Sequence, residues 1–305
     1  MAIRNIIIMG GAGPIGSNLI EDLYKENNIF LFDKNIKNKK NKKINLIKGD
    51  CFNLNDLNKL PKKIDVIFFF IGAKGGPESV KVDSIKKYIK LNFESLVFFI
   101  NFLKKKKIKK IIFSSTEHVY GDSDTSNKKC LDLEPFPKNY YGFSKLLSEK
   151  YLFDFYQKTG VSVDILRIPR VIYFNDESII SKIIIKFFKN QKIFLKKTKA
   201  KFNFIFMTDL IQAMKICLLQ EKTDFRILNI FNNTAPISSL DMAKKIKNLI
   251  KKKNKISLIK NNSIEHNPFN LFISNKFTKH SLNWTPKFSL IKIIKKLIIH
   301  YEFKN

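Results

Sequence analysis

The stretch Ile6-Ile7-Ile8-Met9-Gly10-Gly11-Ala12-Gly13-Pro14-Ile15-Gly16 decides the fold of this 305-residue chain. Its first four residues form an apolar run of strand length, and glycines follow at intervals of three, at positions 10, 13 and 16. An amphipathic segment comes next, so the pattern predicts a strand, a tight turn and a helix. Glycine lets the backbone come close to a pyrophosphate, whose charge is favoured at a helix N-terminus. Pro14 suits the first helical position, where its missing N–H costs nothing.

A second apolar run, Ile29–Phe32, ends directly at Asp33, which lies about 20 residues after the glycines. In a dinucleotide-binding fold this position holds the acid that hydrogen-bonds the hydroxyls of the adenosine ribose. A solvated loop aspartate is the alternative interpretation, and the glycine turn upstream makes it the weaker one. An acid here repels a ribose phosphate, so the sequence favours NAD over NADP. The lysines at positions 34, 37, 39 and 40 could offset that repulsion, which keeps NADP as an alternative.

Composition indicates a globular protein of one large domain or two modest ones. The chain is 44% hydrophobic, yet no apolar run approaches the roughly 20 residues that span a bilayer. The first strand begins almost at once, which leaves no room for a signal peptide. The three cysteines, Cys51, Cys130 and Cys217, suit neither a disulfide framework nor a zinc site. We therefore expect a cytoplasmic protein with no metal and no membrane insertion.

The net charge of +31 raises the question of a nucleic-acid partner. Only four of the 57 basic residues are arginine, and lysine, asparagine, isoleucine and phenylalanine are all abundant. These four residue types share A/T-rich codons, so the base composition of a genome explains the bias without any partner. The lysine clusters also flank the expected elements rather than interleaving with aromatic residues. We expect no nucleic-acid partner.

Strand and helix patterns alternate over the first half of the chain. After the glycine turn and the run ending at Asp33, the expected strands are Ile44–Lys48, Val66–Ile71, Ile111–Phe113 and Val163–Ile168. The longest helical patterns are Ile85–Leu103 and Tyr140–Tyr156. This alternation predicts an α/β fold with a doubly wound parallel sheet, in which ligands bind beyond the carboxyl ends of the strands. Gly10, Asp33, Gly72 and Thr116 all fall at such ends.

The pattern loosens beyond residue 170, which indicates a smaller second unit. We expect residues 1–169 to form the dinucleotide-binding domain and 170–305 a smaller α/β substrate-binding cap. A segment near 204–232 is expected to return to the first domain. The helices expected here are Ile179–Phe188, Ser239–Ile250 with Ser238 as its cap, Leu290–Tyr301, and one capped by Asp209. The expected strands are Phe202–Met207 and Ile227–Ile230.

Tyr141 and Lys145 are four residues apart on an expected helix, so their side chains share a face. A neighbouring ammonium group stabilises a phenolate and lowers the pKa of the tyrosine toward neutrality. Such a tyrosine can accept a proton from a sugar hydroxyl while hydride leaves the adjoining carbon. The hydroxyl of Thr116 can orient the same substrate oxygen, with Ser115 as the fallback. The alternatives are a chance surface pair and a hydroxyl that only caps the strand end.

These segments resemble the extended short-chain dehydrogenase/reductases of the NAD-dependent sugar epimerase/dehydratase family. Residues 10–16 are similar to the family's nucleotide turn, although Pro14 replaces the usual aromatic residue. The resemblance continues at Gly49-Asp50, which is similar to the adenine-contacting pair. It extends to the catalytic segments Ser115-Thr116-Glu117-His118-Val119-Tyr120-Gly121 and Tyr141-Gly142-Phe143-Ser144-Lys145, and to the later markers Arg167-Ile168-Pro169, Phe206-Met207-Thr208-Asp209 and Asn283-Trp284-Thr285-Pro286.

The resemblance implies a nucleotide-diphosphate sugar bound between the two domains, with Tyr141 as acid/base, Thr116 as the orienting hydroxyl and Lys145 also holding the nicotinamide ribose. It further implies a homodimer formed by the helices around Asn92–Leu103 and Leu146–Phe155. The cofactor-binding residues are expected to be Gly10, Gly13, Pro14, Ile15, Gly16, Asp33, Asp50, Cys51, Gly72, Ala73, Asn92, Ser114, Tyr141 and Lys145. The substrate-binding residues are expected to be Ser115, Thr116, Glu117, His118 and Arg170.

Three departures from the family pattern narrow the expected activity. Glu117 and His118 stand where dehydratases carry an acidic pair, which disfavours a 4,6-dehydratase. Arg170 stands where many epimerases have asparagine, and Phe202 where many have an arginine for the substrate diphosphate. Arg170 is therefore the expected replacement for that charge. We favour a 4-epimerase, with a 4-ketoreductase as the alternative and a non-catalytic dinucleotide-binding protein as a weaker one.

Overall fold

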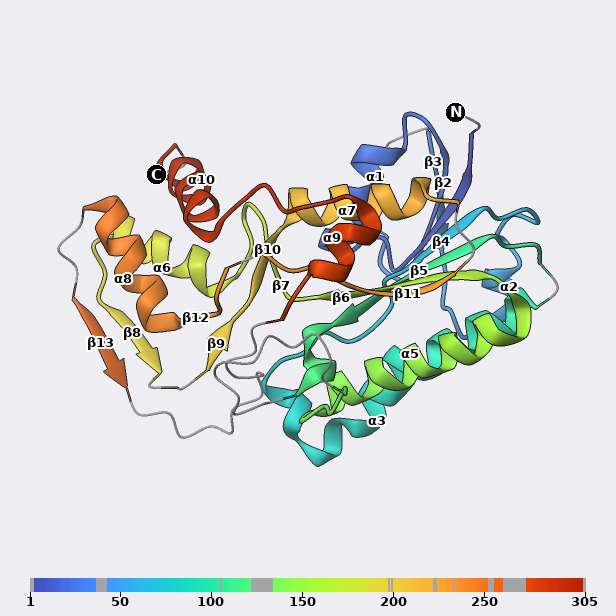
Figure 1. Cartoon of the computed structure of the whole chain (residues 1–305), viewed down its shortest axis with the longest axis horizontal. Coiled ribbons are helices and arrows are strands. Elements are labelled where there is room, and N and C mark those ends of the chain that lie inside the picture. Colours follow the sequence, from blue (N-terminus) through green and yellow to red (C-terminus); the bar gives the residue numbers. More distant parts are fainter. Residues whose placement is uncertain are drawn as a thin grey trace.

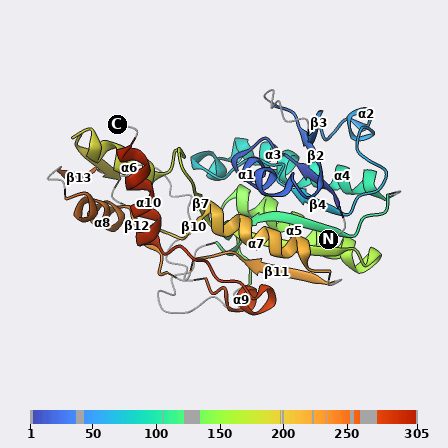
Figure 2. The same ribbon diagram turned by 90° about the horizontal axis from the view of Figure 1, so that it is seen from above.

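The computed structural model describes residues 3–36, 43–104, 106–121, 134–196, 198, 200–221, 224–232, 234–251, 255–259 and 273–303. A seven-stranded sheet forms its larger part (Figures 1 and 2). The strand order is β11-β6-β5-β4-β1-β2-β3, and every pairing between neighbours is parallel. The strands are β1 (Asn5–Met9), β2 (Asn28–Asp33), β3 (Ile44–Lys48), β4 (Val66–Phe69), β5 (Lys110–Thr116), β6 (Ser162–Ile168) and β11 (Phe225–Asn229). The predicted doubly wound parallel sheet is confirmed.

Residues on the two faces of the sheet alternate, as the period of a strand requires. In β1, Ile6 and Ile8 pack on one side, against α1 (Pro14–Leu23) and α7 (Met207–Leu219). Ile7 and Met9 pack on the other, against α4 (Ser95–Leu103) and α5 (Tyr140–Thr159). All four side chains are fully buried, and each such burial stabilises the fold by about 1.5–3 kcal/mol. Figure 1 shows α1 and α7 on one face and α5 on the other.

The smaller helices complete these two layers. The short α2 (Leu54–Leu57) and α3 (Ile85–Tyr88) lie on the α5 side, and α9 (Lys276–Leu282) contacts α7 on the opposite side. The helix expected over Ile85–Leu103 is present, but a π-helical turn over Ile89–Glu94 interrupts it. Such turns often occur at functional sites.

A separate core lies beyond the sheet, in the left part of Figure 1. Its helices are α6 (Ile179–Phe188), α8 (Ser239–Ile250) and α10 (Leu290–Glu302), close to their expected bounds. Ser238 caps α8 as expected, since its hydroxyl accepts a hydrogen bond of 3.1 Å from the Asp241 N–H. The short strands of this part are β7 (Arg170–Ile172), β8 (Ile193–Lys196), β9 (Lys201–Phe202), β10 (Phe204–Phe206), β12 (Ile237–Ser238) and β13 (Ile256–Ile259).

The strand expected over Phe202–Met207 was wrong in extent. Asn203 separates β9 from β10, and Met207 already begins α7. Asp209 does not cap that helix. Its carboxylate accepts hydrogen bonds from the backbone N–H groups of Lys287 (2.9 Å) and Phe288 (3.0 Å), which ties the segment before α10 to α7. The parallel pair of β8 and β13 was not expected from the sequence.

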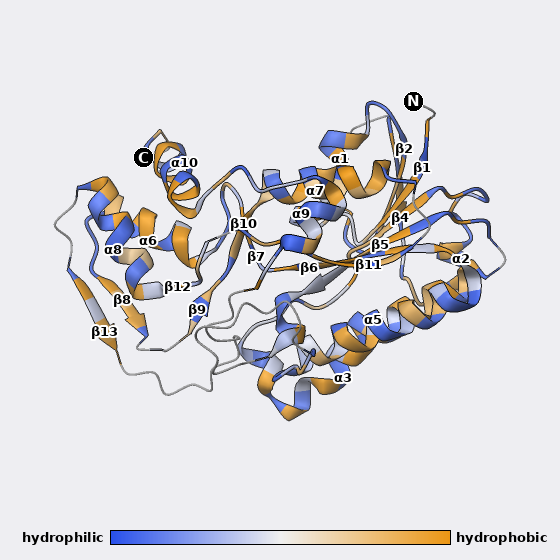
Figure 3. Ribbon diagram, in the orientation of Figure 1, coloured by the Kyte–Doolittle hydropathy of each residue, from blue (hydrophilic) through white to orange (hydrophobic). Residues whose placement is uncertain are grey.

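Hydrophobic and hydrophilic residues alternate along the helices, as Figure 3 shows for α5, α7 and α10. This pattern suits helices with one face in a core and one in water. Among the residues that the structure describes, no helix is both long enough and apolar enough to cross a bilayer. Cys51 and Cys217 are buried free thiols, whereas Cys130 lies outside the described residues.

Candidate active site

A cavity of about 1230 Å³ opens at the carboxyl ends of the six strands β1 to β6. Nearly all the residues expected to bind cofactor or substrate line this one cavity, although they come from segments up to 160 positions apart. The sequence-predicted residues in its wall are Gly10, Gly13, Pro14, Ile15, Gly16, Asp33, Asp50, Cys51, Gly72, Ala73, Ser114, Ser115, Thr116, Glu117, His118, Tyr141, Lys145 and Arg170. Of the expected set, Asn92 alone is not in this wall.

The glycine turn between β1 and α1 forms one end of the cavity, and its geometry excludes side chains. Gly10 has a φ of +73°, and a Cβ there would lie 2.7 Å from the backbone nitrogen of Ile71. A Cβ on Gly16 would lie 2.5 Å from the Cα of Gly11. At Gly13, by contrast, a Cβ would lie no closer than 3.8 Å to any neighbouring atom considered. The turn is therefore packed tightly behind and open in front, as a pyrophosphate cradle at the N-terminus of α1 requires.

Asp33 ends β2 beside this cradle. Its carboxylate accepts hydrogen bonds from the N–H groups of Ala12 (3.0 Å) and Asn35 (2.9 Å), so it also fixes the glycine turn. Nearby, Lys34 forms a 2.7 Å ion pair with Asp50, and this hydrogen bond lowers the pKa of Asp50. Lys34 therefore already has an anionic partner in this end of the cavity. The arrangement suits a ribose with free hydroxyls better than one that carries a phosphate.

We expect Asp33→Asn to weaken the binding of NADH about tenfold, because an amide replaces a charge-assisted acceptor of the ribose hydroxyls. The same change removes the repulsion of a ribose phosphate, so NADPH should bind relatively better. Fluorescence titrations of both reduced cofactors measure this. An unchanged ratio of the two dissociation constants would rule out the proposed role of Asp33.

Asn92 supports the cavity from behind. It is fully buried in the π-helical turn, where its Oδ1 accepts a 2.7 Å hydrogen bond from the Ala73 N–H. Its Nδ2 donates to the hydroxyl of Ser144, on the first turns of α5. A Cβ on Gly72 would collide with Asn92 Oδ1 at 2.5 Å. Asn92 thus holds the loop after β4 against α5 instead of facing the cofactor cavity as expected. Cys51 is buried, and burial raises the pKa of its thiol to about 11, so it packs as a neutral group.

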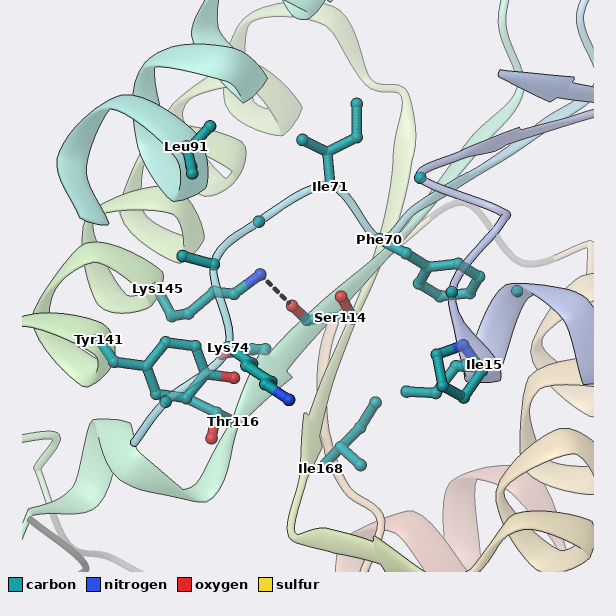
Figure 4. Close-up of a pocket in the computed structure, with 18 of the residues that line it drawn as sticks. Ile15, Phe70, Ile71, Lys74, Leu91, Ser114, Thr116, Tyr141, Lys145 and Ile168 are labelled. Atoms are coloured by element: carbon teal, nitrogen blue, oxygen red, sulfur yellow. Dashed lines mark hydrogen bonds between the residues drawn. The ribbon is translucent and has the colours of Figure 1, made fainter. Parts of the chain in front are cut away.

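The hydroxyls of Tyr141 and Thr116 lie near each other in the cavity. Figure 4 shows both projecting into it, Tyr141 from α5 and Thr116 from the end of β5. The start of α5 fixes this approach, because the Asn139 side chain accepts a 2.8 Å hydrogen bond from the Gly142 N–H. A Cβ on Gly142 would lie 2.3 Å from the carbonyl oxygen of His118. Only glycine lets the first turn of α5 press this closely on the segment that follows Thr116.

Lys145 does not lower the pKa of Tyr141 in this structure, contrary to the sequence-based expectation. Its Nζ donates a 2.9 Å hydrogen bond to the Ser114 carbonyl and lies 4.7 Å from the centre of the Phe113 ring (Figure 4). Burial raises the pKa of Tyr141 to about 12, although the nearby hydroxyl of Thr116 opposes this rise. Burial also lowers the pKa of Lys145 to about 8. The phenol is therefore protonated at neutral pH, and the ammonium of Lys145 is bound to the Ser114 carbonyl and not to the phenol oxygen.

A buried ion pair between Arg167 and Glu149 lies next to the carboxyl end of β5. Arg167 donates to Glu149 through Nη2 at 2.6 Å and through Nε at 3.1 Å. The hydroxyl of Ser115 donates to the same carboxylate, so it is engaged away from the substrate side. Ser115 was expected as a substrate contact and as the fallback for Thr116, and this bond argues against both roles. Glu149 was missed, although it follows Lys145 by four positions on the same helix face.

The other end of the cavity carries Glu117, His118 and Arg170. Glu117 is buried, accepts a 3.1 Å hydrogen bond from Asn203 and faces the charge of Arg170. Burial outweighs both and raises the pKa of Glu117 to about 7. The His118 ring packs edge-on against Tyr141, and its Nδ1 pairs with Asn139 at 2.9 Å. Asn203 was not predicted as a site residue, because its contact with Glu117 spans 86 positions.

Because the pKa of Glu117 is raised, the free energy of unfolding should depend on pH. A carboxyl that binds its proton more tightly in the folded state stabilises the fold below its unfolded pKa, and this contribution is lost as the pH rises through about 7. We expect the free energy of unfolding of Glu117→Gln, minus that of the parent, to increase between pH 4.5 and 8 by on the order of 3 kcal/mol. Urea unfolding at several pH values measures it. A difference that does not change with pH would contradict this prediction.

The family of the chain follows from its similarity to known proteins. A family model described as the NAD dependent epimerase/dehydratase family matches residues 6–232. The chain belongs to this family. It is therefore an NAD-dependent enzyme of the extended short-chain dehydrogenase/reductase type. The described residues fit NAD, because the space in front of Gly13 and the carboxylate of Asp33 lie in one continuous cavity.

Curated relatives carry several activities. A dTDP-D-glucose 4,6-dehydratase of Dictyostelium discoideum is 29% identical over 280 residues, which cover 81% of this chain and 62% of that relative. The chain thus spans less than two thirds of that relative's length. UDP-glucuronic acid decarboxylase 3 of Arabidopsis thaliana is 25% identical over 309 residues, covering 93% of this chain and 85% of the relative. Proteins similar to this chain therefore carry out more than one reaction.

Solved structures show the same fold. A variant of the UDP-glucuronic acid 4-epimerase from Bacillus cereus, in complex with UDP-4-deoxy-4-fluoro-glucuronic acid and NAD, superposes with a TM-score of 0.85 at 21% identity and covers 99% of this chain and 100% of that chain. The UDP-glucose 4-epimerase of Thermotoga maritima, with UDP-glucose, has a TM-score of 0.83 at 18% identity, with coverages of 98% and 99%.

Proposed function

We propose that this enzyme is a nucleotide-sugar 4-epimerase that uses NAD. The observation that carries the proposal is that the hydroxyls of Tyr141 and Thr116 project into the same cavity as the glycine cradle. One oxygen of a substrate can bond to both hydroxyls at once, and this places it for proton transfer. The proposal divides the chain as the sequence suggested: residues 1–169, with the segment near 204–232, hold the cofactor, and the remainder closes over the sugar.

NAD, when bound, supplies a centre that accepts a hydride and gives it back. The cradle from Gly10 to Gly16 would hold its pyrophosphate, Asp33 its adenosine ribose and Lys145 its nicotinamide ribose. Thr116 donates to the oxygen on carbon 4 of the sugar and keeps it near Tyr141. The phenol oxygen of Tyr141 takes the proton of that hydroxyl during oxidation and returns it during reduction.

A phenol with a pKa near 12 is a poor source of phenolate, the form that accepts a proton, at neutral pH. A positive charge brought into the cavity lowers the pKa of a nearby phenol, since it favours the phenolate. The ammonium of Lys145 lies behind Tyr141 and can add to this effect by moving from the Ser114 carbonyl, which now holds it. Proton transfer at Tyr141 thus becomes favourable only when the cavity is occupied.

Glu117 and His118 support the epimerase over a dehydratase. The second of the two positions after Thr116 holds an imidazole instead of a carboxylate. A 4-ketoreductase would use the same hydroxyl pair, but it would consume one reduced cofactor in each turnover. The two activities therefore differ in whether reduced cofactor must be added.

The test is to incubate the enzyme with UDP-glucose, UDP-galactose, UDP-glucuronate and dTDP-glucose, and with their 4-keto derivatives, and to identify products by ¹H NMR. We expect one of the sugars to be converted to its 4-epimer with NAD and without added NADH. Reduction of a 4-keto sugar only when NADH is added would replace the epimerase by the ketoreductase. A 4-keto-6-deoxy product would replace it by a dehydratase.

A further inference from the structure

Three contacts from outside α5 hold the ring of Tyr141. The His118 ring packs edge-on against it, with the two ring centres 5.4 Å apart. The Tyr88 ring, at the end of α3, is tilted against it at 6.1 Å between centres. The third contact is the backbone of Gly75, in the loop after β4, where a Cβ would lie only 2.6 Å from Cδ1 of Tyr141. Figure 4 shows Lys74 of the same loop next to Tyr141, so the position of the phenol depends on this loop.

One helical segment fixes that loop at two successive residues. The Oδ1 of Asn92 accepts a 2.7 Å hydrogen bond from the Ala73 N–H. Tyr88 lies four positions before Asn92, and its hydroxyl donates a 3.2 Å hydrogen bond to the carbonyl of Lys74. Both side chains are buried, and Tyr88 is only 2% exposed. Gly75 follows directly, so it is held where it meets the phenol ring.

Gly75 lacks a side chain because of the ring and not because of its backbone. Its φ lies outside the left-handed region that favours glycine. The three atoms nearest to an added Cβ all belong to the Tyr141 ring. At Gly76, by contrast, no atom considered lies within 4 Å of such a Cβ. The two adjacent glycines therefore separate contact with the ring from the other effects of an added methyl group.

We propose that Tyr88 is a positioning residue for the proton transfer at Tyr141. Its hydroxyl holds the loop so that Gly75 keeps the phenol oxygen beside the hydroxyl of Thr116. Tyr88 itself is not in the cavity wall, so it acts through the loop and the ring. This inference rests on the proposed function, since it takes Tyr141 as the acid/base. Proton transfer needs this precision, because a displacement of about 1 Å costs on the order of 100-fold in rate.

The test measures kcat, KM and NADH binding, with whichever of UDP-glucose, UDP-galactose, UDP-glucuronate and dTDP-glucose is converted. Gly75→Ala should lower kcat about 100-fold, because the Tyr141 ring must retreat by about 1 Å. Tyr88→Phe should lower kcat about fivefold, because it removes one hydrogen bond to the loop. Both variants should bind NADH within twofold of the parent. Gly76→Ala is the matched control, since Gly76 is not in the cavity wall, and it should keep kcat within twofold.

A double-variant comparison distinguishes positioning from a general structural role. In Tyr141→Phe the oxygen to be positioned is gone, so adding Tyr88→Phe should change the remaining kcat less than twofold. A further fivefold loss in this background would overturn the inference. So would normal turnover by Gly75→Ala and Tyr88→Phe when Tyr141→Phe is inactive. If Tyr141→Phe itself turns over normally, the proposed acid/base role fails instead.

A second readout does not depend on turnover. Tyr141 is replaced by 3-fluorotyrosine, and its ¹⁹F NMR resonance is followed in the same variants. We expect the resonance to shift or broaden in Gly75→Ala and Tyr88→Phe and to match the parent in Gly76→Ala. An unchanged resonance in the first two variants would refute the inference even if no sugar is converted. Absence of a 4-epimer from the NMR panel would count against the proposed function alone.

Discussion

Replacing Tyr141 with phenylalanine is expected to lower kcat/KM for the nucleotide sugar about 1,000-fold and to leave NADH binding within twofold. The change removes one oxygen, which is the proposed proton acceptor and donor at carbon 4. General acid–base groups contribute about 100- to 10,000-fold to rates. The ring itself remains, so its packing against Gly75 and the His118 ring should persist. Steady-state kinetics and a fluorescence titration of NADH measure the two effects.

Tyr140→Phe is the matched control, because Tyr140 precedes Tyr141 on α5 and is half-buried like it but is not in the cavity wall. We expect the control to retain kcat/KM within twofold. If Tyr141→Phe turned over as fast as the parent, the acid/base role would be wrong. If it also lost NADH binding, the defect would lie in the cavity and not in proton transfer.

The largest effect on stability is expected from Asp164→Asn, far from the cavity. Asp164 is fully buried in β6 and receives Arg226 of β11 through two hydrogen bonds of 2.7 and 2.8 Å. Lys110 of β5 lies 3.3 Å away and donates to the carbonyls of Cys217 and Gln220, at the end of α7. The amide would remove the buried anion that faces both cations and would leave Arg226 with only its 3.5 Å contact to Asp224, which costs about 3–5 kcal/mol. Urea unfolding monitored by circular dichroism measures the loss.

Asp154→Asn is the comparison for this change. Asp154 pairs with Lys158 at 2.8 Å on the exposed face of α5, where such pairs contribute less than about 0.5 kcal/mol. We expect its free energy of unfolding to match that of the parent within that range. A loss of less than 1 kcal/mol in Asp164→Asn would mean that this buried cluster does not hold β11 to the sheet.

The sheet and most of its helices could be predicted because their signals are local. An apolar run that ends in glycine, or in a small polar residue, predicts a buried strand whose carboxyl end faces a ligand. Five such ends do meet at one cavity. The cap of α8 by Ser238 was equally local. The strand expected over Phe202–Met207 failed because its apolar pattern does not reveal that Asn203 turns toward Glu117.

The electrostatics of the site could not be predicted, because they depend on contacts between distant segments. The i+4 spacing of Tyr141 and Lys145 places both on one helix face, but it does not say which acceptor the ammonium will find. That acceptor is the Ser114 carbonyl on a neighbouring strand. The role of Asp209 depends likewise on backbone groups 78 and 79 positions later. Sequence spacing predicts candidate reactive residues, whereas packing determines their partners and their pKa values.

The central claim is that hydride leaves carbon 4 of the sugar and returns to the same carbon while Tyr141 moves the proton. The most direct measurement uses the nucleotide sugar that the panel shows to be converted, deuterated at carbon 4, in ordinary water with catalytic NAD. NMR of the product then reports the isotope at that carbon. We predict a 4-epimer that retains its deuterium with no net formation of NADH. A 4-epimer that has exchanged its deuterium for solvent hydrogen would contradict this account.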